Sequence, residues 1–136
     1  MPPDEQLAAA DGWLAYARSV VAVAHACCDR PEILGWAIAF HCQRAVEKAF
    51  KGAMVARGVE PPRTHDLVRL EELLVGMGLR TPHALNDLDR LTPFAIDDKY
   101  PKIKLHSVSR EAAISMIPTA ELAVKWLSAL LAAQPT

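Results

Sequence analysis

Polar side chains suited to phosphate or ribose contacts gather in one part of the chain. Basic and acidic residues recur between positions 41 and 51, and a second group follows at positions 63–66. Arginine and lysine bind phosphate oxygens, and histidine exchanges a proton near neutral pH. These residue types predict a surface that binds a phosphate-bearing ligand or a partner. Its predicted members are His41, Arg44, Glu47, Lys48, Lys51, Arg63, His65 and Asp66.

A purely structural interpretation of these residues stays open. Glu47 and Lys51 have the i,i+4 spacing that stabilises a helix, and Arg44 with Lys48 would then form ordinary solvated surface. In that case the chain is an interaction module without a ligand site. If the surface is functional, we expect Glu47 and Asp66 to orient the neighbouring cations rather than to act on a substrate.

Other common sites are absent from the sequence. It has no glycine-rich phosphate loop, no HExxH or GxSxG motif, and three cysteines without CxxC spacing. We therefore predict no metal and no cofactor. The formal net charge of −1 excludes a global basic field of the kind that drives non-specific nucleic-acid binding. Any RNA contact must come from a local patch.

The elements that position these residues are predicted to be helices, because apolar residues recur at steps of three and four. The second predicted helix is the longest, with Arg44, Lys48 and Lys51 opposite its main apolar face. Proline, glycine and capping residues set the boundaries. The first predicted helix runs from Glu5 to Cys28 after an Asp4 cap, and the second from Pro31 or Glu32 to Arg57 with Gly58 at C′. The third begins at Leu67 after a cap by Thr64 or Asp66, and the fourth runs from Pro82 to Leu91 after a Thr81 cap. The last begins after Ser109 and is broken at Pro118, near Ile117.

No strand-like alternation and no linker interrupts this pattern. The sequence therefore predicts an all-α, four- to five-helix up-and-down bundle, with residues 1–136 as a single domain. The N-terminus lacks a basic leader, and the longest apolar run, Val20–Cys28, is shorter than the ~20 residues of a membrane span. We expect a cytoplasmic protein without a membrane segment.

Three linked motifs resemble the HEPN domain family. Phe40–Lys51 is similar to the FHxQQAxEKxxKA signature of that family, and Arg57–Leu67 resembles its ARGxxPPxTHDL turn. Asp98–Pro101 is similar to a [RK]-Tyr-Pro element, which makes Tyr100 a predicted stacking or hydrogen-bonding residue. The chain departs from the signature at Arg44, where glutamine is commoner, and this enlarges the basic face. The order of helices matches over nearly the whole chain.

The resemblance implies a helical homodimer, often encoded beside a minimal nucleotidyltransferase as a toxin–antitoxin pair. Some HEPN proteins are metal-independent ribonucleases with an arginine, four to six residues and a histidine in a late helix. Arg18 and His25 have this spacing but lie in the first predicted helix. We therefore expect a non-catalytic HEPN domain that binds a nucleotide, an RNA or a nucleotidyltransferase partner. The alternative is a ribonuclease toxin that uses Arg63 and His65.

Overall fold

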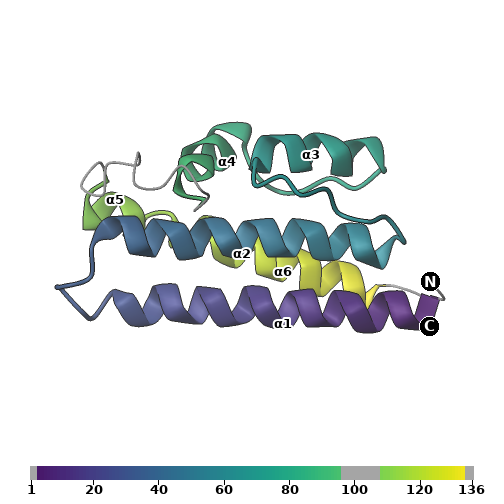
Figure 1. The fold of residues 1–136 in the computed structure, drawn as a ribbon, viewed down its shortest axis with the longest axis horizontal. Coiled ribbons are helices and arrows are strands. Elements are labelled where there is room, and N and C mark those ends of the chain that lie inside the picture. The colour runs from purple at the N-terminus through teal and green to yellow at the C-terminus, as the bar shows by residue number, and fades with distance from the viewer. Residues whose placement is uncertain (1–2, 96–107, 134–136) are drawn as a thin grey trace.

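The computed structural model describes residues 3–95 and 108–133, and their ordered elements are all helical (Figure 1). This confirms the predicted all-α class and the bundle of four to five main helices. Helices α1 and α2 run antiparallel side by side, α6 lies behind them, and α3 and α4 cover the opposite side of α2. The elements are α1 (Pro3–Cys27), α2 (Gly35–Ala56), α3 (Leu67–Gly76), α4 (Leu85–Leu91), a 3₁₀ turn η1 (Thr92–Phe94), α5 (Arg110–Ile114) and α6 (Ile117–Ala132).

Helix α2 is the centre of the core, because α1, α3, α5 and α6 all pack against it. Its Gly52 allows α1 and α6 to approach closely: an added Cβ atom would lie 2.8 Å from Cβ of Trp13 and 2.9 Å from Cδ2 of Leu127. Any larger residue at this position would push α1 and α6 away from α2. The apolar face predicted for α2 is buried as expected, at Ile38, Ala39, Cys42, Val46, Ala49 and Ala53.

Several predicted boundaries are confirmed by local geometry. Gly58 follows α2 with a φ of 75°, a left-handed conformation that glycine adopts without a Cβ clash. The side chain of Asp66 accepts hydrogen bonds from the backbone N–H groups of Val68 and Arg69, so Asp66 rather than Thr64 caps α3. The last predicted helix is split near Ile117, where α6 begins with Pro118 in its first turn.

Three predicted helix starts are wrong. Helix α1 begins at Pro3, so Asp4 lies within its first turn instead of capping it. Helix α4 begins at Leu85 rather than Pro82, because the backbone of Ala84 is extended, with a ψ of 140°. The hydroxyl of Thr81 donates to Glu71 and does not cap the helix.

The third wrong start is that of α2, which begins at Gly35 rather than at Pro31 or Glu32. The guanidinium of Arg110 donates to the carbonyl oxygens of Cys27, Cys28 and Ile33. These bonds satisfy the last carbonyls of α1 and hold the connection as a turn. Because Arg110 comes from the far end of the chain, local sequence could not indicate this.

One helical stretch of the described residues is long and apolar enough to cross a membrane. Arg110–Ala132 has 23 residues and a mean hydropathy of 1.3 over its best window. Length and composition are weak grounds for a span, because core helices pass the same test. Four residues of α6, Ile117, Ala120, Ala123 and Leu127, are buried within the bundle. The absence of a membrane segment stays a prediction.

Candidate functional site

The carboxylate of Glu47 is the centre of a buried polar cluster on α2. Its side chain is 2% exposed and accepts hydrogen bonds from Nε2 of Gln43 at 3.0 Å and Nζ of Lys51 at 3.0 Å. Nδ1 of His65 lies 2.9 Å from Oε1, and Nζ of Lys48 lies 3.3 Å from Oε2. We call Gln43, Glu47, Lys48, Lys51 and His65 the Glu47 network.

The network keeps Glu47 ionised. Burial alone would raise the pKa of its carboxyl group, but hydrogen bonds from Gln43, His65 and Lys51, with the positive charge of Lys51, outweigh that effect and lower the pKa to about 2. One anion therefore faces two ammonium groups, Lys48 and Lys51. The formal charges of Glu47, Lys48 and Lys51 therefore leave the cluster with a net positive charge.

Local structure brings the members of the network together. Gln43, Glu47 and Lys51 are spaced four apart on α2 and so share one face. After Gly58 the chain turns back along α2, which sets His65 beside the middle of the helix instead of beyond its end (Figure 1). Nε2 of Gln43 also donates to the backbone carbonyl of His65 at 3.1 Å, which ties the turn to the helix.

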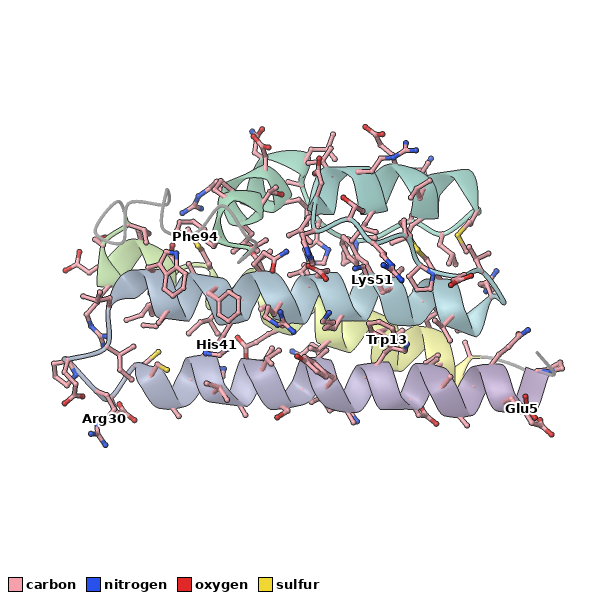
Figure 2. The ribbon with its side chains drawn as sticks, in the orientation of Figure 1. Glu5, Trp13, Arg30, His41, Lys51 and Phe94 are labelled. Atoms are coloured by element: carbon pink, nitrogen blue, oxygen red, sulfur yellow. The ribbon has the colours of Figure 1, made fainter. Side chains whose placement is uncertain are left out.

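Lys51 does not lie on the exposed basic face that the sequence predicted. It is 6% exposed, because the returning segment covers it, and Figure 2 shows it between α2 and that segment. Glu47 and Gln43 are buried as well. The helical pattern placed Lys51 on one face with Arg44 and Lys48 but could not show which of the three a neighbouring segment would bury.

Arg44 and Lys48 instead lie against aromatic rings, of which Trp13 and Tyr16 belong to α1 and Phe40 to α2 itself. Cζ of Arg44 is 5.6 Å from the ring centroid of Tyr16 and 5.5 Å from that of Phe40, and its Nη2 donates to the hydroxyl of Tyr16. Nζ of Lys48 is 5.6 Å from the ring centroid of Trp13 and 5.5 Å from that of Tyr16. Cations at these distances are attracted to the faces of aromatic rings. We call Trp13, Tyr16, Phe40, Arg44 and Lys48 the cation–aromatic face.

A pocket of about 430 Å³ opens at this face, between α1 and α2. Lys48 joins the pocket to the Glu47 network, because it contacts Glu47 on one side and Trp13 on the other. Trp13 and Tyr16 were not among the predicted site residues, since nothing in the sequence of α1 indicates which face meets Arg44. The pocket is lined by Ala9, Gly12, Trp13, Tyr16, Arg44 and Lys48.

The other predicted site residues lie apart from these contacts. Arg63 is exposed and makes no hydrogen bond to any residue that the structure describes, and Asp66 serves as the cap of α3. His41 is half-buried, and its Nδ1 has no hydrogen-bond partner within residues 3–95 and 108–133. Burial, and then the charge of Arg44, lower the pKa of His41. Tyr100 lies outside the described residues.

The histidines differ in what acid–base chemistry they could perform. Arg18 and His25, which have ribonuclease-like spacing, contact α6: Arg18 donates to Ser128 at 3.2 Å, and His25 lies 3.2 Å from Glu121. The imidazole of His65 is 44% exposed and is oriented through Nδ1 by a buried carboxylate.

Among the described residues, no group of three or more His, Cys, Asp or Glu side chains could hold a metal ion.

Comparison with known proteins establishes the family. A family model for the HEPN domain matches residues 11–130, so the chain belongs to the HEPN domain family. The crystal structure of an archaeal HEPN homologue superimposes with a TM-score of 0.68 at 20% sequence identity, over 90% of this chain and 97% of that one. This likeness shows a common fold. A search of curated protein sequences found no match.

Proposed function

We propose that this HEPN domain is non-catalytic and binds the phosphate groups of a nucleotide or an RNA at Arg44, Lys48, Arg63 and His65. The main support for the proposal is the placement of the charged side chains on α2. The only carboxylate of the Glu47 network is buried, whereas Arg44 and Lys48 reach the rim of a pocket. A phosphate at this rim would meet two cations without facing the carboxylate directly.

Because the protein has almost no net charge, phosphate binding would depend on local contacts. With a net charge of −1, the molecule has no field to hold nucleic acid at a distance. Binding would therefore depend on a few close contacts and would be weakened by salt.

A metal-independent endoribonuclease is the second candidate, and the contact between Glu47 and His65 favours it. A carboxylate at Nδ1 holds the ring in one orientation and leaves Nε2 for proton transfer, while the exposed guanidinium of Arg63 could stabilise charge on a scissile phosphate. Against it, the family's Arg/His spacing occurs only at Arg18 and His25, whose side chains contact α6.

We further propose that the domain forms a homodimer and has a minimal nucleotidyltransferase partner in a toxin–antitoxin-type system. The support is the resemblance of residues 40–51 and 57–67 to the HEPN signature motifs. Sedimentation of the purified protein tests the homodimer. Co-purification with the product of an adjacent nucleotidyltransferase gene, if one is encoded there, tests the partner.

Phosphate binding is tested by titrating fluorescently labelled single-stranded RNA, and unlabelled nucleotides as competitors, against the purified protein at low salt. The double variant Arg44→Glu/Lys48→Glu should weaken binding by at least about tenfold, because each reversal removes a charge-assisted contact. Arg90→Glu/Lys125→Glu is the matched control, since both residues are exposed cations on other helices, α4 and α6. Equal weakening by the two double variants would mean that binding follows overall charge, and would contradict the proposed site.

A further inference from the structure

Gly12 lies in the middle of α1 without a structural reason among the described residues. Glycine lowers helix stability relative to alanine, so a mid-helix glycine calls for an explanation. An added Cβ atom at Gly12 would meet nothing within 4 Å, whereas one at Gly52 would clash with Trp13. Gly12 has no positive φ either. The space above Gly12 is therefore open to solvent.

Gly12 lines the pocket of the cation–aromatic face. Ala9 and Gly12 contribute no bulk, while Trp13 and Tyr16 contribute rings. Tyr16 is 43% exposed despite the contacts of its ring with Arg44 and Lys48. Because Gly12 lines this pocket, we expect a larger side chain at position 12 to narrow it.

The chemistry of the lining favours a flat ring that carries a negative group. Exposed aromatic rings stack on nucleobases of any sequence, and neighbouring cations bind the attached phosphates. Arg44 and Lys48 lie one helical turn apart, about 6 Å along the axis of α2, so both can reach one phosphate or two successive ones. A paired base in a duplex is already stacked between its neighbours and could not enter.

We propose that the pocket above Gly12 receives an unpaired nucleobase, whose phosphate lies at Arg44 and Lys48. This inference rests on the proposed function, because it assigns the base to the same surface that binds the phosphate. The base could belong to a free nucleotide or to a single-stranded RNA. It makes Trp13 and Tyr16 ligand-binding residues and gives the glycine a role.

The test fills the pocket without disturbing the fold. Gly12→Leu places a side chain in the pocket and, because leucine is the better helix former, should not lower the melting temperature. Gly76→Leu is the matched control: Gly76 is also an exposed helical glycine whose added Cβ would meet nothing within 4 Å, and it lies on α3. Each protein is titrated with a short single-stranded RNA, the same strand with abasic sites, the corresponding duplex, and adenosine monophosphate.

We expect Gly12→Leu to weaken binding of the single strand by about fivefold or more, because removal of one stacking contact causes a loss of this size. Gly76→Leu should bind the strand as the wild type does. The abasic strand and the duplex should bind the wild type as weakly as the intact strand binds Gly12→Leu. A parallel loss of adenosine monophosphate binding would assign the pocket to nucleotides, and a loss seen with the strand alone would assign it to RNA.

The inference is overturned if Gly12→Leu binds the single strand normally, or if the abasic strand binds as well as the intact one, while Arg44→Glu/Lys48→Glu still abolishes binding. In those cases phosphate binding stands without a base pocket. If none of the phosphate-bearing ligands binds the wild type, the proposed function itself fails. A changed sedimentation coefficient of Gly12→Leu with unchanged RNA binding would show a surface for protein packing and would also overturn the inference.

Discussion

Nδ1 of His65 lies 2.9 Å from Oε1 of Glu47, a residue eighteen positions earlier in the chain. This contact joins the turn before α3 to the middle of α2. It also gives the buried carboxylate a partner that is itself partly exposed, so the Glu47 network extends from the core to the surface. The stability of the bundle and the orientation of its candidate binding residues therefore depend on the same few side chains.

Removing one partner of the buried pair Glu47–Lys51 should destabilise the folded protein. Lys51→Met leaves the carboxylate with fewer donors, and Glu47→Met leaves a buried ammonium group unpaired, so each should lower the free energy of unfolding by about 3 kcal/mol. The double variant should lose less than the sum of the two, because it leaves neither charge unpaired. Urea unfolding measures all three proteins.

The exposed pair Arg69–Glu72, at 3.5 Å, is the control for this cycle. Arg69→Ala should change the free energy of unfolding by less than about 1 kcal/mol, as is usual for surface pairs. A double variant of Glu47 and Lys51 that loses the full sum of the single effects would contradict the coupling.

Acid should weaken the fold through Glu47. Its pKa in the folded protein is lowered to about 2 from an ordinary value of 4.5, so the folded state favours the ionised form. The resulting stability is fully present above pH 4.5 and is lost as the pH falls from 4.5 towards 2.

Melting temperatures measured across that pH range for the wild type and for Glu47→Gln test this linkage. The variant should be less stable near neutral pH, and the difference between the two proteins should shrink as the pH falls. A difference that stays constant with pH would mean that folding does not lower the pKa of Glu47.

The cap of α3 should contribute to stability independently of charge in the core. Asp66→Ala removes the acceptor for the N–H groups of Val68 and Arg69 and should cost about 1 kcal/mol in urea unfolding. Asp66→Asn should retain most of that stability, since asparagine is an equally good cap. Asp89→Ala, at an exposed position of α4, is the control and should have little effect.

The ribonuclease alternative is separated from the proposed function by a cleavage assay in the presence of a chelator. We expect the wild-type protein to leave RNA intact. Metal-independent cleavage that is lost in His65→Ala, a substitution at an exposed position that should leave the helices folded, would establish the alternative and make His65 a catalytic residue.

The sequence could predict what depends on neighbouring residues along the chain. The helical class, the apolar face of α2, the positive φ at Gly58 and the Asp66 cap all follow from local spacing and side-chain chemistry. The motifs at residues 40–51 and 57–67 also indicated the family correctly.

What the sequence could not predict depends on contacts between distant segments. Periodicity placed Arg44, Lys48 and Lys51 on one face, but only the return of the chain towards α3 determines that Lys51 is buried while the other two reach a pocket. One aromatic partner of Arg44, Tyr16, comes from α1, and no local pattern links Tyr16 to a residue 28 positions away. The role of Arg110 in holding the end of α1 is of the same kind.

The central claim, that Arg44 and Lys48 bind phosphate, is tested most directly by the salt dependence of RNA affinity. For single strands, the logarithm of the binding constant falls with the logarithm of salt concentration by about 0.7 per phosphate contact. Measured between about 50 and 200 mM salt, the slope should be shallower by about 1.4 in Arg44→Glu/Lys48→Glu than in the wild type, and unchanged in Arg90→Glu/Lys125→Glu. A wild type and an Arg44→Glu/Lys48→Glu variant with the same slope would contradict the account.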